Sequence, residues 1–188
     1  MIAERGVRSF SLAEASRRLG VTVAAPYRHF ADRDELLAAV AVRAFGTLGA
    51  ALEAADPGAP PPQRLAALAA AYVCFAADHP ALFGVLFGAG LDKDRFPEVR
   101  RAAAPLAGEF TGCVSEICGA DRRAAAALAA AVAATAHGHA TLLLDGALGD
   151  ATGKMAAERA AQATLALVAG RAALGRPALD RPAPGRPD

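Results

Sequence analysis

The segment SLAEASRRLGVTVAAPYRHFADRDELL, residues 11–37, has the pattern of two short helices joined by a glycine turn. Ser11 is placed to cap the first helix, and Glu14, three residues later, is placed to cap it reciprocally. Gly20 follows that helix, where a left-handed residue is required, and Thr22 is expected to cap the second helix. This spacing predicts a helix-turn-helix unit, a motif whose second helix lies in the major groove of DNA.

The second helix is expected to continue through Tyr27, His29 and Phe30, with Pro26 inside it. Proline is tolerated in the first turn of a helix because the N–H groups there have no helical partner. With Thr22 as the cap, Pro26 removes only the first intrahelical hydrogen bond. We therefore expect the helix to form.

The same segment resembles the DNA-binding domain of the tetracycline-repressor (TetR) family. The family pattern of Gly-Val, Leu-Tyr-x-His-Phe, Lys and Leu-Leu is matched in order and spacing by Gly20-Val21, Tyr27-Arg28-His29-Phe30, Arg33 and Leu36-Leu37. The resemblance implies a homodimeric transcription factor, usually a repressor released by a small ligand. It also implies that Met1 to Gly6 form the end of an incomplete first helix. A two-fold pair of recognition helices would read a palindromic operator in double-stranded DNA.

The resemblance and the helix termini suggest roles for residues of the head. The family uses the positions of Tyr27 and His29 for phosphate contacts, and it has Lys where this chain has Arg33. Helix N-termini favour anions, which adds Ser11 and Thr22 to the expected phosphate contacts. The residues expected to reach base edges are Val23, Ala24, Ala25 and Arg28. The expected core of the head is Leu19, Phe30 and Leu36.

Composition limits the classes of function. The net charge is +1 and the isoelectric point is about 7.8, which excludes a general polyanion binder. Residues 1–46 hold seven arginines and five acidic residues, and this modest positive excess predicts DNA affinity that falls with salt. The chain has no nucleophile elbow, phosphate-cradling glycine loop or metal-ligand spacing. We therefore predict no enzyme activity, no metal site and no cofactor.

Two features predict a cytoplasmic protein. The N-terminal residues carry charges throughout, and they lack the apolar run of a signal peptide. The three cysteines, Cys74, Cys113 and Cys118, are odd in number and lack zinc-like spacing. Reduced thiols in a cytoplasmic core are expected, with redox sensing as the alternative.

Beyond the head, the periodicity of apolar residues predicts helices only. The expected ranges are 34–55, 63–78, 96–118, 121–145 and 153–174, with a short glycine-rich apolar segment at 81–90. The proline-rich residues 175–188 predict a disordered tail. The predicted fold class is therefore all-α, with a DNA-binding head at 1–46 and a ligand-binding and dimerisation body at 47–174.

The helix expected at 121–145 is long enough to span a bilayer, and residues 124–144 include no acidic residue, lysine or arginine. Because alanine dominates it and His137 and His139 lie inside it, we expect a helix packed against protein, with no membrane contact. The resemblance implies that this helix and the one at 153–174 form a four-helix dimer interface. The residues expected there are Ala126, Ala130, Ala133, Thr141, Leu165 and Val168.

The stretch Thr135-Ala-His137-Gly138 resembles the His-Gly region of a TetR subgroup whose C-terminal domain is named for a Trp-His-Gly motif, although this chain has no tryptophan. The subgroup implies ligand-responsive repression. His137 is expected either to contact a ligand or to form a hydrogen bond within the core. His137 and His139 point about 200° apart around the helix, so they cannot bind one metal together.

Aromatic residues at helical spacing predict either an apolar ligand cavity or a packed core. The cavity candidates are Cys74, Phe75, Phe83, Leu86, Phe87, Phe110, Cys113 and His137. Because these side chains are mostly apolar, the expected effector is small, apolar and neutral. The helix at 34–55 is expected to be the only rigid link between head and body, so its pivot would couple effector to operator. The alternative is a dimeric ligand-binding module of the same fold that has lost DNA binding.

Overall fold

The structure is a computed structural model that describes residue 2, residues 6–92 and residues 94–174. All regular elements in these ranges are helical, as predicted, and no strand occurs in them. The head contains the 3-10 turn η1 (Val7–Ser9), helix α2 (Leu12–Arg18) and the 3-10 turn η2 (Pro26–Arg28). The body contains α3 (Arg33–Glu53), α4 (Pro61–Asp78), α5 (Pro80–Gly88), α6 (Pro97–Cys118), α7 (Arg122–Leu144), α8 (Gly153–Ala169) and α9 (Arg171–Leu174). The predicted tail, and most of the predicted end of a first helix, lie outside the described residues.

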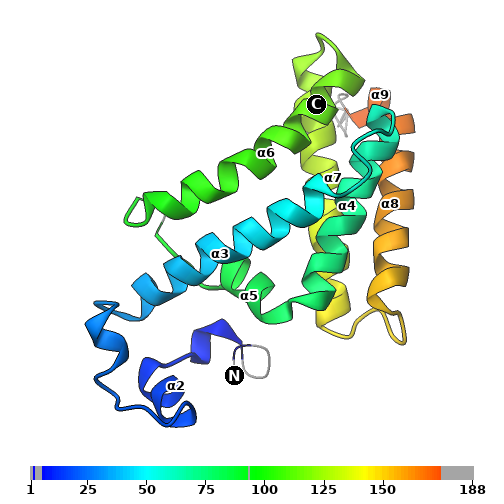
Figure 1. The fold of residues 1–188 in the computed structure, drawn as a ribbon. Helices are drawn as coiled ribbons and strands as arrows, with labels where there is room; N and C mark the ends of the chain where they lie inside the picture. Colours follow the sequence, from blue (N-terminus) through cyan, green and yellow to red (C-terminus); the bar gives the residue numbers. More distant parts are fainter. Residues whose placement is uncertain (1, 3–5, 93, 175–188) are drawn as a thin grey trace, which may run out of the picture.

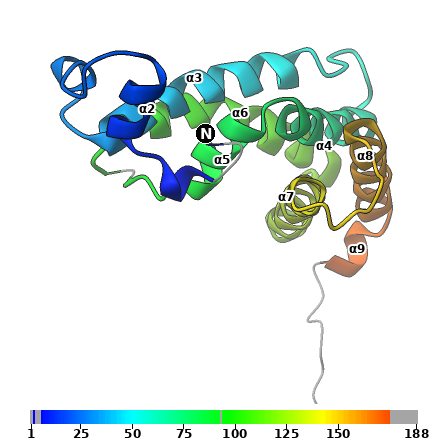
Figure 2. The same cartoon turned by 90° about the horizontal axis from the view of Figure 1, so that it is seen from below.

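The body is built from two sets of helices (Figure 1). Helices α4, α7 and α8 stand side by side, and α3 and α6 run across them. Seen from below, α7 and α8 lie nearly end-on, on the side of the molecule opposite α3 (Figure 2). Leu65 and Val73 of α4 and Leu128 and Val132 of α7 are fully buried where these helices meet. The burial of these apolar side chains drives the packing of the body.

Helix α3 begins at Arg33 because Asp32 caps it. The Asp32 carboxylate accepts a hydrogen bond from the Glu35 N–H at 2.9 Å, which satisfies a donor of the first turn that has no helical partner. The helix ends at Glu53, two residues earlier than predicted, and the chain turns at Asp56, whose φ is 46°. One face of α3 is buried along its length, through Leu37, Ala38, Ala41, Ala44, Leu48 and Leu52.

The predicted break at His79-Pro80 is confirmed, and it separates α4 from α5 by a bend of 108°. Pro80 is the first residue of α5, where its missing N–H costs no helical hydrogen bond. The glycine-rich segment that follows forms a helix of 9 residues, with Phe83 and Val85 buried. Phe87, near the end of this short helix, is 47% exposed.

Helices α7 and α8 both begin at side-chain caps. The Asp121 carboxylate accepts from the Ala124 N–H at 2.9 Å, and the Thr152 hydroxyl accepts from the Met155 N–H at 3.3 Å. The single helix predicted for residues 153–174 is instead two, because α8 ends at Ala169, with Gly170 as its C-cap, and α9 follows.

Helices α3 and α7 are long and apolar enough to cross a membrane, and the bent pair α4–α5 would be a third span if counted as one. In the fold, α7 packs against α4, α6 and α8, and it buries Leu128, Val132, Ala136 and Ala140. The helix is therefore engaged with protein along its inner face, as expected for a packed helix.

The head contacts the body at α3 and also at α5. Besides continuing into α3, it packs Val7 of η1 against α5, in a cluster that includes Val85 and Leu37. The backbone of Gly88 approaches so closely that an added Cβ would lie 3.2 Å from Val7 Cγ1. The prediction that the helix at 34–55 is the only rigid link is therefore wrong, because a buried apolar contact forms a second one.

Candidate nucleic-acid interface and body cavity

Helix α2 ends in a tight turn at Gly20, as the sequence predicts. Gly20 has a φ of 69°, its N–H donates to Arg17 O at 3.3 Å, and the Val21 N–H donates to Ser16 O at 3.1 Å. This pair of bonds is a Schellman motif. The motif needs a residue in the left-handed conformation, which glycine adopts without steric cost. The predicted capping box is wrong, because within the described chain the Ser11 side chain makes no cap hydrogen bond.

The segment after this turn does not form the predicted second α-helix. In residues 22–30, all of which the structure describes, the regular element is the single turn η2. The Ala25 N–H donates to Thr22 O at 3.0 Å and the Arg28 N–H donates to Ala25 O at 3.3 Å, which is 3-10 spacing. Pro26 has no N–H to donate to Thr22 O, so the α-helical bond cannot form there. The expectation that an α-helix would accommodate Pro26 is wrong.

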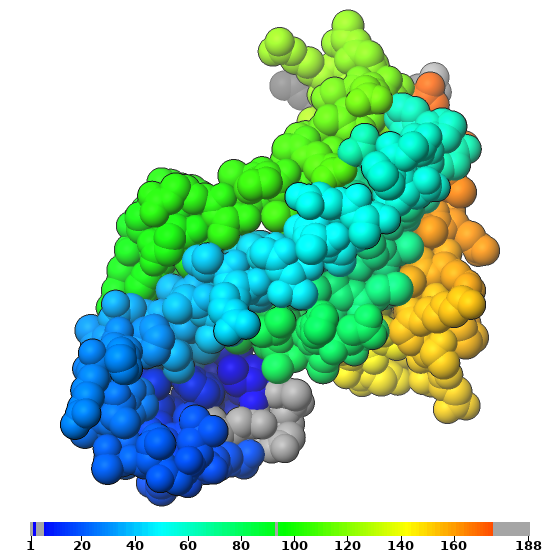
Figure 3. Space-filling model, in the orientation of Figure 1, coloured from blue at the N-terminus to red at the C-terminus, as the bar shows by residue number. Residues whose placement is uncertain are grey.

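The head forms a lobe at one end of α3 (Figures 1 and 3). Most of the residues predicted to contact DNA have exposed side chains on it, and Tyr27 is 52% exposed. The exposed residues are Ser11, Thr22, Val23, Ala24, Tyr27, Arg28 and His29, whereas Ala25 is half-buried. These side chains are accessible to a partner without a change in the body.

Arg33 differs from the other predicted DNA contacts because its guanidinium is directed into the protein. It donates to Val7 O at 2.7 Å and to Phe10 O at 3.0 Å, and it pairs with the Asp34 carboxylate at 2.8 Å. Hydrogen bonds from a charged donor are stronger than neutral ones. Arg33 therefore ties the residues around η1 to the start of α3, a role that sequence reasoning missed.

None of the three residues predicted for the core of the head is fully buried. Leu19 is 78% exposed, so its placement in the core is wrong. Leu19 is the C-cap residue of α2, and its side chain therefore lies past the last helical turn, where no described element covers it. Phe30 and Leu36 are half-buried.

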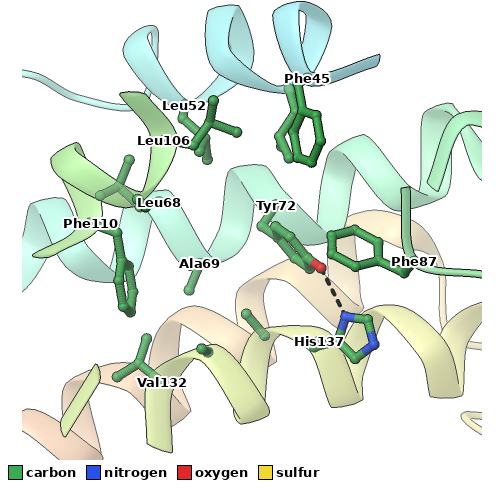
Figure 4. Close-up of a pocket in the computed structure, with 14 residues that line it drawn as sticks. Phe45, Leu52, Leu68, Ala69, Tyr72, Phe87, Leu106, Phe110, Val132 and His137 are labelled. Atoms are coloured by element: carbon green, nitrogen blue, oxygen red, sulfur yellow. Dashed lines mark hydrogen bonds between the residues drawn. The ribbon is translucent and has the colours of Figure 1, made fainter. Parts of the chain in front are cut away.

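The body contains an apolar cavity of about 380 Å³ between α3, α4, α5, α6 and α7 (Figure 4). Its lining residues are Phe45, Leu48, Leu52, Leu68, Ala69, Tyr72, Phe87, Leu106, Ala107, Phe110, Val132, Ala133, Ala136 and His137. Phe87, Ala107 and Ala133 are also exposed, so the cavity opens to the surface beside them. Its volume lies within the usual range of small-molecule sites, roughly 300–1,000 Å³.

Only two of the described lining residues, Tyr72 and His137, have polar side chains, and they bond to each other. The Tyr72 hydroxyl and His137 Nδ1 are 2.9 Å apart (Figure 4). Burial raises the pKa of Tyr72, so the phenol keeps its proton and can donate it to the ring nitrogen. The His137 ring also stacks on Phe83, at 5.5 Å between ring centroids, and meets Phe87 edge-on at 5.0 Å.

Three of the predicted ligand residues, Phe87, Phe110 and His137, line the cavity. The structure does not bring the other five to it: Phe75, Phe83 and Cys113 are buried in the core, and Cys74 and Leu86 pack against that core. Sequence reasoning missed Tyr72, although it lies in an otherwise apolar stripe of α4 with Leu65, Leu68 and Phe75. A phenol in such a stripe is the signal that would have found it.

Among the described residues of the body, the remaining polar and thiol groups do not form a metal site. His139 Nδ1 bonds to Thr135 O at 2.8 Å, one turn back on its own helix, and so faces away from His137. Burial raises the pKa of the Cys74 and Cys113 thiols, which keeps them protonated. No group of three metal-ligating side chains occurs in the part of the chain that the structure describes.

The outer faces of α7 and α8 expose apolar and small side chains. They include Ala126, Ala130, Ala133, Leu142, Met155 and Leu165. Val168, which was expected on the same surface, is buried in the core, and its expected contact with a partner subunit is wrong. Ala133 lies both on this face and at the opening of the cavity.

Two family models match the chain. "Bacterial regulatory proteins, tetR family" matches residues 1–40, and "Tetracyclin repressor-like, C-terminal domain" matches residues 65–168. No protein of curated function matches it.

Solved structures share the fold. A protein of unknown function from Rhodococcus sp. RHA1 is 32% identical, with a TM-score of 0.68 and coverage of 88% of each chain. The TetR family transcriptional regulator PfmR from Thermus thermophilus is 19% identical, with a TM-score of 0.71 over 88% of this chain and 92% of that one. A TetR-like transcriptional regulator from Rhodococcus sp. RHA1 is 19% identical, with a TM-score of 0.68 over 93% and 90%. Together with the helical head and body, the family matches show that this chain belongs to the TetR family of transcriptional regulators.

Proposed function

We propose that this regulator is a cytoplasmic homodimer that represses transcription from a palindromic operator and is released by a small apolar molecule. The observation that carries the proposal is the cavity, because it lies between the two helices that hold the head, α3 and α5, and the rest of the body. A molecule that fills the cavity contacts Phe45 of α3 and Phe87 of α5 directly. Binding of a molecule in the cavity would thereby be linked to the position of the head.

The head would meet DNA through the exposed surface around η2. Tyr27, His29, Ser11 and Thr22 supply hydrogen-bonding groups for phosphates, and Arg28 is the side chain best suited to guanine. Val23, Ala24 and Ala25 offer apolar contacts to thymine methyl groups. Arg33 supports this surface from behind in the structure, so we assign it a positioning role rather than the expected phosphate contact.

A dimer is proposed because one short recognition turn reads too few bases for specificity. The exposed small residues of α7 allow close approach of a second copy, and the apolar side chains of α8 add buried area. Two heads related by two-fold symmetry would read half-sites about one helical turn apart, or a multiple of it.

The DNA-binding part is tested by selecting bound duplexes from a random pool with the full chain. We expect an inverted repeat to be enriched, affinity to fall as salt rises, and Arg28→Ala to weaken binding. If no duplex is enriched while the protein is folded and dimeric, the DNA-binding proposal fails.

The ligand response is tested with isopentylbenzene, a neutral apolar probe. It should lower affinity for the selected operator, and operator should lower affinity for the probe by the same factor, typically about 5- to 150-fold. Equal probe affinity for free and DNA-bound protein would contradict the release mechanism.

A dimeric ligand-binding module without DNA binding is the second candidate. It is favoured by one observation, namely that the recognition segment is a single 3-10 turn rather than an α-helix. Probe binding combined with failure of the duplex selection would support it.

A further inference from the structure

We propose that the cavity selects an aromatic hydrocarbon and that the hydrogen bond between Tyr72 and His137 sets this preference by withholding the phenol proton and His137 Nδ1 from the ligand. This inference rests on the proposed function, because it specifies the chemical class of the effector. It concerns the cavity lining alone, so it can be tested without DNA.

The walls determine what the cavity can recognise. Its described lining contains no Asp, Glu, Lys or Arg, and the backbone around it is helical. Apart from Tyr72 and His137, every lining side chain is aliphatic or a phenylalanine. A charged group placed inside the cavity would lose its hydration without gaining a partner, a cost that burial of the rest of the ligand does not recover.

The two polar side chains are hydrogen-bonded to each other. The phenol can donate its single proton to His137 Nδ1, 2.9 Å away, and that nitrogen then has no further hydrogen-bonding capacity. The tautomer that this bond requires carries its N–H at Nε2, which lies on the side of the ring away from Tyr72 (Figure 4). A ligand carbonyl placed beside the phenol would therefore find no free donor there unless it broke this bond.

The size and shape of the cavity narrow the class further. At about 30 Å³ for a water-sized group, 380 Å³ holds about a dozen non-hydrogen atoms. Phe45, Tyr72, Phe87 and Phe110 present aromatic rings to it from four different helices. Offset and edge-to-face contacts with such rings favour an aromatic ligand over an aliphatic one of equal size.

The experiment uses three ligands of the same shape that differ in one group. They are isopentylbenzene, 4-phenylbutan-2-one and 3-phenylpropanoate, which carry an isopropyl, a methyl ketone and a carboxylate at the same place. Affinity for the full chain is measured by headspace partitioning for the volatile compounds and by dialysis for the acid. We expect the hydrocarbon to bind at least about tenfold more tightly than the ketone, and the acid not to bind.

Variants separate the hydrogen-bonded pair from the general hydrophobic effect. Tyr72→Phe and His137→Phe each leave one polar group unpaired, so each should narrow the hydrocarbon-to-ketone ratio by about three- to tenfold, the worth of one neutral hydrogen bond. The double variant has no unpaired polar group and should restore the wild-type ratio. His139→Gln, a change on the same helix outside the cavity, is the matched control and should leave the ratio unchanged.

Equal binding of ketone and hydrocarbon by the wild-type protein would overturn the proposal. An unchanged ratio in folded single variants would overturn it too. If one single variant fails to fold, the other one and the double variant decide the outcome. Hydrocarbon binding with the expected ranking, but without any effect on operator affinity, would support this inference and contradict the proposed release mechanism instead.

Discussion

Arg28 and Arg33 lie close together in sequence, yet the fold places their side chains in opposite environments. Arg28 is exposed on the surface proposed to meet DNA, whereas Arg33 donates to two backbone carbonyls of the head. A charged group held in this way contributes to the position of the head rather than to a direct contact. Substitution of each residue therefore separates a direct contact with DNA from a contribution to the stability of the head.

Arg33→Ala should lower the free energy of unfolding by roughly 1.5–3 kcal/mol, because it removes charged donors from the carbonyls of Val7 and Phe10. Arg28→Ala should leave stability unchanged and lower operator affinity. Chemical denaturation and an operator titration measure the two effects. Reduced operator affinity for Arg33→Ala at full stability would show instead that Arg33 contacts phosphate.

Because the phenol of Tyr72 is buried, it should ionise only at a more alkaline pH than an ordinary tyrosine does. Burial raises its pKa above the ordinary tyrosine value of about 10. In the unfolded chain this phenol ionises near pH 10, whereas in the folded protein it stays protonated, so alkali favours the unfolded state. The contribution of Tyr72 to the free energy of unfolding should therefore be fully present below about pH 10 and be lost as the pH rises further.

The ultraviolet titration of Tyr27→Phe checks this expectation, because Tyr72 is then the only tyrosine of the chain. We expect little tyrosinate at pH 10.5 in the folded variant and ordinary ionisation in denaturant. Tyrosinate that forms in the folded variant near pH 10 would show that Tyr72 is not buried.

At the scale of elements, the same residue type acts differently according to its place in a helix. Pro97 is the first residue of α6 and costs nothing there, whereas Pro26 replaces an α-helix by a 3-10 turn. Pro26→Ala should therefore restore an α-helix in the recognition segment. Slower amide exchange in residues 26–30 would report it, and Pro97→Ala is the control that should change nothing. Unaltered exchange in both variants would mean that another constraint prevents the helix.

Close packing of α4 against α8 depends on Gly153, since a Cβ at that position would lie 2.7 Å from the Ala77 Cβ. Gly153→Ala should destabilise the protein by about 1–3 kcal/mol, because backbone must move to relieve the overlap. Gly46→Ala, in open space on α3, should be neutral or stabilising by up to about 1 kcal/mol. Thermal unfolding compares the two, and equal stability would show that the α4–α8 contact adapts freely.

At the scale of the whole molecule, the exposed faces of α7 and α8 are proposed to bury each other in a dimer. Leu165 is 39% exposed on α8, so Leu165→Glu should place charges opposite each other across a two-fold axis and dissociate the dimer. Sedimentation velocity should give twice the 19.0 kDa chain mass for the wild type and the chain mass for the variant. Thr47→Glu, exposed on α3, is the control and should stay dimeric. A wild-type protein that sediments as a monomer would contradict the dimer.

Local sequence signals determined the helical class and most helix bounds. Periodic apolar residues, the glycine turn at Gly20 and the break at His79-Pro80 act through the chain's own neighbours, so they can be read without a fold. The family resemblance likewise rests on a contiguous motif, and the family matches confirm it. Pro26 is a local signal whose effect is larger than expected, because the loss of one N–H in so short a helix removes a large share of its hydrogen bonds.

Tertiary structure alone decided which side chains meet. The cavity is formed by one face from each of five helices, so its lining depends on how those helices cross, and Tyr72 and His137 are far apart in sequence. The inward turn of Arg33 and the contact of Val7 with α5 are likewise long-range. Helical periodicity specifies which residues share a face, but only packing decides whether that face meets a cavity, the core or solvent.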